Sequence, residues 1–392
     1  MTLGLAGIVL ASAAPASAQS IDDYQAIIDT YLAERGEAEG ITGVSVYISL
    51  GDPGPGIELF AGTTGRDGAT PITGDTLFQI GSNTKAFTAA LILDLEAEGS
   101  LNIDQTIGDW LPDYPAWGDV TIRRLLNMTS GIPNYSESPE WMRMAAEDPD
   151  RHFTPEELIA LAYPGATVEL PPNDGYFYSN TNYLLAGLIA EQAGGMPYGD
   201  ALRQRFFAPT QLGDTFYQPL AYPSEVTERM ARGYFEDPAC SFYVPDCEET
   251  ELADLMGQDI SRADVSWAGP AGGIVSSPRD LARWVRAVFD GRVLPPAQLE
   301  ELLSPVSVET GEPIEDVSAD DPAGFSLGFA RRFREGLGAF WFYQGETLGY
   351  RAVFIYSPET DVVVTGATNS HPFAEDNQFV PMMARLYALA TQ

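Results

Sequence analysis

The sequence has little positive charge, and almost none of that charge comes from lysine. Among 392 residues there are 21 Lys or Arg against 56 Asp or Glu, and Lys85 is the only lysine. The formal net charge of −35 argues against nucleic acid and anionic lipid as partners, because both would repel the chain. The acidic residues are spread along the chain, which is typical of a solvated acidic coat.

Histidine is nearly absent as well, with only His152 and His371. Both are interpreted as solvated loop residues, and for His371 the alternative is a place in the wall of a cleft. Without a G-x-S-x-G motif, a Ser-His-Asp hydrolase is disfavoured. No cluster of His, Cys and Glu has the spacing of metal ligands, and no Gly-rich phosphate loop is present. We therefore expect neither a metal nor a cofactor.

Cysteine is limited to Cys240 and Cys247, in the Pro- and Asp-rich stretch DPACSFYVPDCEE. In an oxidising compartment two cysteines this close favour a disulfide that closes a loop. Two free thiols are the alternative.

Long apolar runs are missing beyond the N-terminus, so no segment is expected to span a bilayer. The N-terminus, MTLGLAGIVLASAAPASAQS, joins an apolar run to Ala16-Ser17-Ala18. This pattern predicts a signal peptide over residues 1–18, cleaved before Gln19. The predicted mature protein, 19–392, is periplasmic or secreted and has no membrane anchor.

The apolar periodicity predicts strands near both ends of the chain and helices between them. A helix capped by Ser20 is followed by a hairpin over 43–51 and 56–65. Three successive antiparallel strands are expected over 338–349, 350–358 and 361–369, and a helix over 377–390 closes the chain.

The predicted fold class is α+β, a single domain of two lobes. One antiparallel sheet is built from both ends of the chain (19–80 and 265–392) and is flanked by the terminal helices. A helical lobe is inserted between these ends at 81–264. A site is expected in the cleft between the sheet and the helical lobe.

Lys85 follows Ser82 by three residues, in FQIGSNTKAFTAA. If a helix begins at about Ser82, both side chains lie on one face, with the hydroxyl at the positive end of the helix dipole. Burial lowers the pKa of an amine, so a neutral lysine can activate a serine. Arginine cannot do so, because it does not deprotonate. Ser82 and Lys85 are therefore candidate catalytic residues.

A second polar group, Tyr178-Ser179-Asn180, precedes a strongly apolar helix in GYFYSNTNYLLAGL. Tyr178 can pass a proton between nucleophile and leaving group, and Asn180 can hold a substrate carbonyl and the lysine. The structural interpretation is a helix cap formed by Ser179, Asn180 or Thr181. The two interpretations are compatible.

A third segment, FYQGETLGY, lies in the predicted strand region. Gly345 permits a ligand to approach the strand edge, and the backbone N–H of Glu346 can pair with that of Ser82 as an oxyanion hole. An ordinary strand with a glycine-containing turn is the alternative.

Together these three motifs resemble those of the serine hydrolases that include class C β-lactamases, D-alanyl-D-alanine carboxypeptidases, D-amino-acid peptidases and related esterases. The stretches LLNMTSGIPNY and AGPAGGIVSSPRDLARW are also similar to that family. The resemblance extends from about Ile21 to the C-terminus. It implies the fold of penicillin-binding proteins, with Ser82 acylated and Lys85 as its base. It also implies proton transfer by Tyr178 and substrate binding by Asn180.

One position departs from the family pattern. The third motif in the family usually begins with Lys or His, whereas here it begins with Tyr343, in Tyr343-Gln344-Gly345. Tyr343 cannot supply a cation for a substrate carboxylate, which favours an esterase or a neutral-amide hydrolase over a β-lactamase. Arg331 or Arg332 could compensate, although surface positions are the alternative for both.

The resulting hypothesis is an exported serine hydrolase that cleaves an ester, amide or peptide bond of a small molecule or short peptide through an acyl-enzyme on Ser82. The alternatives are a non-catalytic binding or sensor protein with the same fold, and acyl transfer to an alcohol or amine instead of water. The sequence does not define the oligomeric state.

Overall fold

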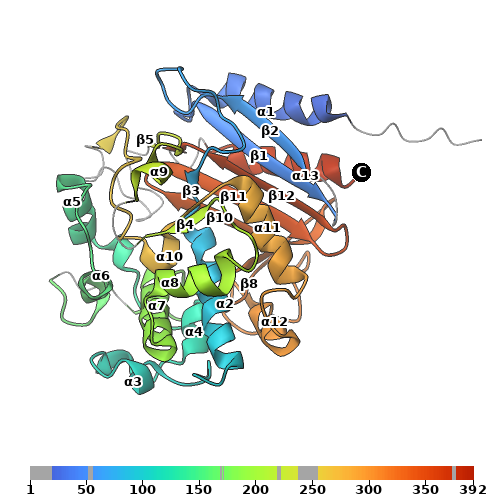
Figure 1. Ribbon diagram of the computed structural model, residues 1–392. Helices are drawn as coiled ribbons and strands as arrows, with labels where there is room; N and C mark the ends of the chain where they lie inside the picture. Colours follow the sequence, from blue (N-terminus) through green and yellow to red (C-terminus); the bar gives the residue numbers. More distant parts are fainter. Residues whose placement is uncertain are drawn as a thin grey trace, which may run out of the picture.

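The computed structural model contains an antiparallel sheet with the two terminal helices on one face and helices from the middle of the chain on the other (Figure 1). The predicted signal peptide, Cys240 and Cys247 lie outside the described residues. The described residues are 20–51, 56–167, 170, 172–218, 222–236, 255–372 and 377–392.

The main sheet, within the described residues, has eight strands in the order β2-β1-β12-β11-β10-β9-β8-β7. The predicted N-terminal hairpin and the three predicted C-terminal strands are all present in it. The strands are β1 (Gly43–Leu50), β2 (Ile57–Gly62), β7 (Val306–Ser307), β8 (Ala323–Phe325), β9 (Ala330–Arg334), β10 (Gly338–Thr347), β11 (Tyr350–Ser357) and β12 (Val362–Thr368).

The register shows how the two ends of the chain meet. In β1, Val46 pairs with Leu59 of β2 on one side and with Gly366 of β12 on the other. Strands from the N-terminal and C-terminal ends of the chain are therefore paired within one sheet, which confirms the predicted fold class. The exact boundaries of the two lobes stay a prediction.

Helices are the other main element of the described chain. They include several of only one turn. The helices are α1 (Ile21–Arg35), α2 (Thr84–Ala97), α3 (Ile107–Trp110), α4 (Ile122–Leu126), α5 (Pro139–Glu147), α6 (Pro155–Ala162), α7 (Asn180–Gly194), α8 (Tyr198–Leu202), α9 (Ser224–Thr227), α10 (Gly269–Gly272), α11 (Pro278–Phe289), α12 (Pro296–Leu302) and α13 (Phe379–Ala390).

The first helix begins as the sequence predicts. The Ser20 hydroxyl accepts a hydrogen bond from the backbone N–H of Asp23, and the Asp23 carboxylate accepts one from the N–H of Ser20. Tyr24 and Ile28 are buried, whereas Ile21 is 61% exposed. Ile21 is the first residue of the helix.

One face of the sheet is covered by α1 and α13. Ile28 of α1 and Met383 of α13 are fully buried against Val46 and Val364 of the sheet. Burying a side chain of this size contributes about 1.5–3 kcal/mol. The terminal helices are therefore fastened to the sheet by a core separate from that of the opposite face, where α11 packs.

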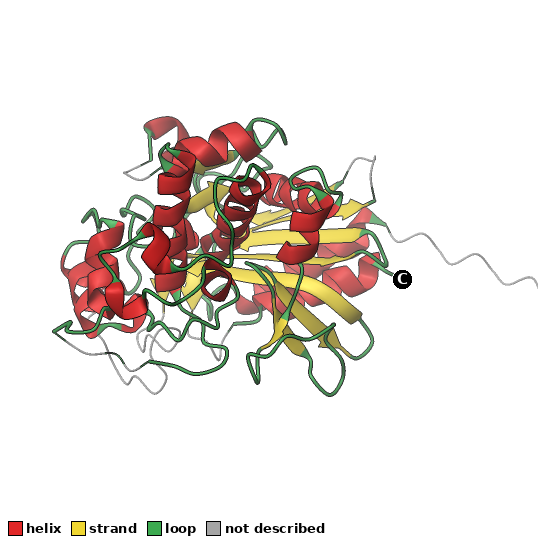
Figure 2. Cartoon of the chain, turned by 90° about the horizontal axis from the view of Figure 1, so that it is seen from below, coloured by secondary structure: helices red, strands yellow, loops and turns green. Residues whose placement is uncertain are grey.

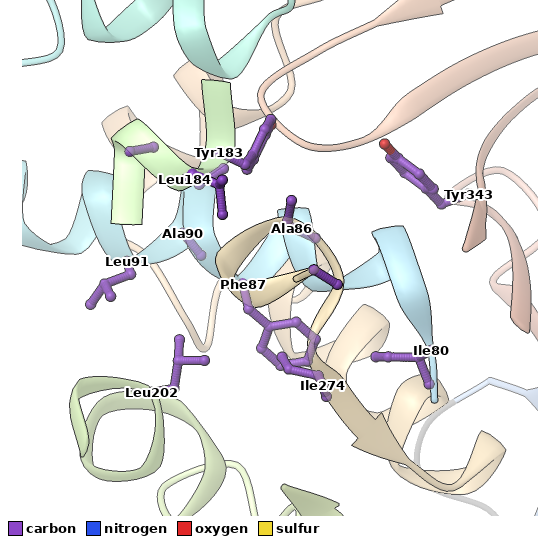
Figure 3. Close-up of a cluster of buried hydrophobic side chains, with 14 of the residues drawn as sticks. Ile80, Ala86, Phe87, Ala90, Leu91, Tyr183, Leu184, Leu202, Ile274 and Tyr343 are labelled. Carbon is purple, nitrogen blue, oxygen red and sulfur yellow. The ribbon is translucent and has the colours of Figure 1, made fainter. Parts of the chain in front are cut away.

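The helical lobe is organised around α2, most of whose residues are buried. A helix that is apolar on all sides belongs in the interior of a protein. Figure 2 shows the strands together on one side of the molecule and a group of helices on the other. Figure 3 shows Phe87 and Leu91 of α2 among side chains that include Leu184 of α7 and Leu202 of α8.

The described chain also contains five short strands that the sequence patterns did not indicate, two of them within the predicted helical lobe, 81–264. The three-stranded sheet β3-β6-β4 lies at the base of α2, and β5 pairs with β13. These strands have only two or three residues, too few to display an alternating pattern. They are β3 (Phe78–Gln79), β4 (Thr215–Tyr217), β5 (Tyr234–Glu236), β6 (Ile274–Ser276) and β13 (Ser370–Pro372).

Candidate active site

Ser82 lies in a single 3-10 turn, Gly81–Asn83, that joins β3 to α2. The α-helix begins at Thr84 and not at Ser82 as expected. The correction is small, since Lys85 still stands three residues on and its side chain reaches Ser82. Ser82 is 8% exposed and Lys85 is fully buried. The serine is therefore accessible from solvent, while the amine is behind it.

Three oxygen atoms surround the Lys85 amine. Nζ lies 2.8 Å from Oδ1 of Asn180, 2.7 Å from the carbonyl oxygen of Ala271 and 3.0 Å from Oγ of Ser82. No carboxylate of the described residues forms an ion pair with it. Burial therefore holds the pKa of Lys85 well below its usual value.

This geometry suits a neutral amine. A neutral amine has two N–H groups and one lone pair, and the two carbonyl oxygens of Asn180 and Ala271 can accept both N–H groups. The lone pair is then left for the hydroxyl proton of Ser82. The arrangement can deprotonate Ser82 without moving any side chain.

Tyr178 approaches Ser82 from the other side. Its Oη lies 2.6 Å from Ser82 Oγ, and its ring lies beneath the Lys85 amine, 4.8 Å from Nζ to the ring centre. Burial raises the pKa of Tyr178 to about 12, against the opposing effect of its hydrogen bond with Ser82. A protonated Tyr178 donates to Ser82, while Ser82 donates to Lys85, so the direction of both hydrogen bonds is set.

Asn180 is the first residue of α7, directly after Ser179 at the N-cap. The Ser179 hydroxyl donates to the carbonyl of Pro133 and makes no capping bond to the helix. The Asn180 amide donates to Ser136 through Nδ2, which orients Oδ1 toward Lys85. Ser179 therefore occupies the N-cap position, as the cap interpretation predicts, but its side chain does not cap the helix.

The third segment lies on β10. The Tyr343 hydroxyl donates toward Oη of Tyr178 across 3.5 Å, the limit for a hydrogen bond. Figure 3 shows this hydroxyl pointing away from β10, toward the side of the helical lobe where Tyr183 lies. Burial raises the pKa of Tyr343 well above its usual value, so it stays protonated.

Gly345 serves a different purpose from the one expected. A Cβ at Gly345 would lie 1.9 Å from the carbonyl oxygen of Ile80. The chain itself, in the turn that carries Ser82, occupies the space that we assigned to a ligand. A Cβ at Gly81, whose φ is +50°, would likewise lie 2.4 Å from the backbone nitrogen of Glu346. The two backbones are thus in direct contact beside Ser82.

The two candidate arginines differ in position. Arg331 forms a two-point ion pair with Asp316 and its guanidinium stacks on Trp341, away from Ser82. Arg332 instead lines the same pocket as Ser82 and Tyr343. It donates through Nη1 to the carbonyls of Gly324 and Arg331.

The pocket in front of Ser82 has a volume of about 470 Å³. Its walls come from both lobes, and aromatic rings predominate. A narrow recess on the other side of Ser82 is lined by Trp267, Gly272 and Glu346 among others. The pocket is lined by Ser82, Asn134, Ser136, Glu137, Tyr176, Phe177, Tyr178, Asn180, Phe325, Ala330, Arg332, Phe342, Tyr343 and Gln344.

Several residues of the site carry no signal in the sequence. Ala271 contributes only its backbone carbonyl, which no side-chain pattern reveals. Ser136 and Glu137 lie in SGIPNYSES, just after a stretch that resembles the family, yet no spacing connects them to Ser82. The expectation that His371 is a solvated loop residue is wrong. His371 is buried in β13, and its Nδ1 lies 2.9 Å from the carbonyl oxygen of Thr347.

The described part of the chain contains no group of three or more His, Cys, Asp or Glu placed to hold a metal ion. Nor does any of its helices have the length and apolar character needed to cross a membrane.

Comparison with protein families gives a match to the family described as Beta-lactamase over residues 28–389. Penicillin-binding protein 4* of Bacillus subtilis (strain 168) is 32% identical over 246 residues, which are 62% of this chain and 52% of that protein. The chain spans about half the length of the curated relatives that head this comparison.

Solved structures match over almost the whole chain. D-amino acid amidase from Ochrobactrum anthropi SV3, complexed with D-phenylalanine, has a TM-score of 0.75 and 28% identity over 94% of this chain and 97% of that one. A D-stereospecific amidohydrolase from Streptomyces sp. has a TM-score of 0.69 and 26% identity over 90% of this chain and 95% of that one.

Proposed function

This chain belongs to the Beta-lactamase family of serine hydrolases, and from that membership we propose that it hydrolyses amide or ester bonds of small substrates through an acyl-enzyme on Ser82. The observation that carries the proposal is the buried Lys85 amine, whose two N–H groups face carbonyl oxygens while its lone pair faces Ser82.

In the first half of the proposed reaction, Ser82 Oγ attacks the substrate carbonyl and its proton moves to Nζ of Lys85. The backbone N–H groups of Ser82 and Glu346 bind the developing oxyanion. As the bond to the leaving group breaks, Tyr178 gives its proton to the leaving nitrogen or oxygen. The proton held on Lys85 then restores Tyr178.

In the second half, water attacks the acyl-enzyme and releases the acid. Its proton passes to the Tyr178 and Lys85 pair, and the bond to Ser82 Oγ breaks as Oγ regains a proton. No metal or cofactor is needed for either half, since each proton has a donor and an acceptor within the site.

The pocket supports an acyl group with an aromatic or large apolar side chain. Tyr176, Phe177, Phe325 and Phe342 all line it. The structural neighbours are named as a D-amino acid amidase and a D-stereospecific amidohydrolase, which supports amides of D-amino acids as the first substrates to test. Tyr343 supplies no cation at the position where the family usually has one, which supports an amide over a β-lactam.

Export is the second part of the proposal. It is supported by the signal-peptide pattern of residues 1–18. N-terminal sequencing of protein recovered outside the cytoplasm is expected to begin at Gln19, and intact residues 1–18 in that fraction would contradict it.

The nucleophile can be identified directly. A fluorophosphonate probe followed by peptide mapping is expected to place the adduct on Ser82. The Ser82→Ala protein is expected to lose both the adduct and the hydrolysis of p-nitrophenyl acetate. An adduct on another residue, or equal hydrolysis by the variant, would contradict the proposal. Added hydroxylamine distinguishes acyl transfer from hydrolysis, because acyl transfer gives a hydroxamate and hydrolysis gives the free acid.

A further inference from the structure

The pocket in front of Ser82 contains two opposite charges that have no charged partner within the described residues. Glu137 lies on the helical-lobe wall, in the 3-10 turn Tyr135–Glu137, and Arg332 lies on the sheet wall, in β9. Because isolated charges are costly to bury, groups of this kind are usually paired. Here the substrate can supply both partners.

The Arg332 guanidinium is held in place but not neutralised. Its Nη1 donates to two backbone carbonyls, at 2.9 Å to Gly324 and 3.1 Å to Arg331. Its Nε and Nη2 have no protein acceptor among the residues described, although neither is a buried unsatisfied atom. These two N–H groups are therefore not fully buried, and because Arg332 lines the pocket they are available to bind a carboxylate there in a two-point geometry.

Arg332 is also embedded in aromatic surroundings. Burial lowers the pKa of its guanidinium, and Tyr176 and Tyr343, which line the same pocket, are both protonated. Its neighbour Arg331, by contrast, forms a two-point ion pair with Asp316 through Nε and Nη2. The chain has thus placed a restrained cation in the pocket and a neutralised one outside it.

Glu137 is the matching anion. Its Oε1 accepts a hydrogen bond of 3.3 Å from Nδ2 of Asn134, and no Lys, Arg or His of the described chain forms an ion pair with it. Burial raises the pKa of this carboxyl. The other carboxylate near Ser82, that of Glu346, is already bonded to Gln344 and contacts Asn377. Glu137 is therefore the carboxylate available to a ligand in this pocket.

The position of each charge relative to the reacting atoms assigns it to one end of the substrate. Arg332 lines the pocket on the same side as Tyr343 of the sheet, whose hydroxyl adjoins Tyr178, the proposed proton donor to the leaving group. Its carboxylate partner therefore belongs to the leaving group. Glu137 follows Ser136, which is bonded to Asn180, on the opposite wall. Its partner therefore belongs to the acyl group.

We infer that the pocket selects zwitterionic short peptides, with the free amino terminus bound by Glu137 and the free carboxyl terminus of the leaving residue bound by Arg332. The inference rests on the proposed hydrolysis of amides at Ser82 and names the class of amide. It makes the enzyme one that removes a residue from a very short peptide, because both termini must reach the same pocket.

A set of four compounds tests each end separately. D-phenylalanyl-glycine is compared with its N-acetyl form, its C-terminal amide and the doubly blocked form. Affinity is measured by calorimetry on the Ser82→Ala protein, so that no turnover is needed. Blocking either end is expected to weaken binding by about tenfold or more, the factor for one charge-assisted hydrogen bond.

Two variants on the same Ser82→Ala background assign the effects. In Arg332→Gln, amidation of the carboxyl terminus is expected to cause no further loss of affinity, whereas acetylation of the amino terminus still does. In Glu137→Gln, acetylation is expected to cause no further loss, whereas amidation still does. Arg332→Lys, which keeps the charge, is expected to restore part of the preference. The matched controls are Arg331→Gln and Glu140→Gln, neighbours outside the pocket, which are expected to leave all four affinities as they are.

The inference is overturned if free and blocked peptides bind alike, if none binds at millimolar concentration, or if either variant weakens all four equally. Its failure is distinct from failure of the proposed function. Hydrolysis of p-nitrophenyl acetate that depends on Ser82 would still establish the acyl-enzyme chemistry when the peptide set shows no preference.

Discussion

At the scale of single residues, the site depends on which side chain holds a proton. Burial acts in opposite directions on the two groups beside Ser82: it lowers the pKa of Lys85 and raises that of Tyr178. Both shifts favour the neutral forms, a base on one side of the hydroxyl and an acid on the other. The same low-polarity surroundings thus prepare acceptor and donor together.

Replacing the base by a permanent cation is the strictest test of this arrangement. Lys85→Arg is expected to lower the acylation rate by about 10²–10⁴-fold, the usual contribution of a general base, because arginine cannot give up a proton. Stopped-flow measurement with p-nitrophenyl acetate checks this. Arg283→Lys, an exposed position on α11, is the control. Acylation at the parent rate in Lys85→Arg would remove lysine from the mechanism.

The pH profile follows from the two shifts. Activity requires neutral Lys85. We therefore expect kcat/KM to increase with pH up to the lowered pKa of Lys85 and to level off at higher pH. No alkaline loss from Tyr178 is expected at neutral or mildly alkaline pH, because burial raises its pKa to about 12. Tyr178→Phe is expected to keep the rising limb at a lower rate. A profile that falls with increasing pH would contradict this assignment.

At the scale of secondary-structure elements, the site depends on the contact between the 3-10 turn and β10. The backbone of Gly345 leaves no room for a side chain beside the carbonyl of Ile80. The strand and the turn can approach this closely only because Gly345 and Gly81 have no Cβ. This contact sets where the N–H of Glu346 lies relative to Ser82.

Gly345→Ala therefore has a specific expected result. The added methyl must push β10 away from the turn, which displaces one wall of the proposed oxyanion hole. We expect kcat to fall by about 10²-fold or more, the cost of losing one oxyanion donor, together with a lower melting temperature. Gly213→Ala, at an exposed position where a Cβ meets nothing within 4 Å, is the control. Unchanged kcat in Gly345→Ala would show that this contact is irrelevant to the site.

The elements also show what the sequence could predict. The hairpin, the three C-terminal strands and both terminal helices have long periodic patterns, and all were found. Ser82, Lys85, Tyr178 and Asn180 are predictable as candidates because their chemistry resides in side chains at familiar spacings. The structure brings them within hydrogen-bonding distance of one another.

What sequence patterns could not predict has a common cause. The carbonyl of Ala271, the short strands and the contact at Gly345 are backbone features, determined by packing between distant segments. Arg331 and Arg332 are adjacent and chemically identical in sequence. Only the fold places one against Asp316 and the other in the pocket.

At the scale of the whole molecule, the two ends of the chain are joined by a buried ion pair. Arg351 on β11 donates from Nη1 to Glu39, 2.8 Å away, and both side chains are fully buried. Glu39 also accepts from Tyr31 of α1 and from the backbone of Gln378 at the start of α13. One carboxylate therefore connects the first helix, the sheet and the last helix.

Removing that carboxylate is expected to destabilise the protein by about 3–5 kcal/mol, because the Arg351 charge would stay buried without its partner. Glu39→Gln tests this in urea unfolding, with Glu37→Gln, an exposed neighbour, as the control. The chemistry at Ser82 is expected to persist under native conditions. A midpoint equal to that of the parent would mean that the pair contributes no net stability.

The burial of the only lysine has a spectroscopic consequence. Protein grown with lysine labelled by ¹⁵N and ¹³C has one labelled side chain, and that side chain is the proposed base. Its Cε and Nζ resonances need no assignment and no correction for overlap, even in a chain of 392 residues. A pH titration followed by magnetic resonance would report the pH at which Lys85 loses its proton. Repeating the titration with a bound inhibitor would show how a ligand changes that pH.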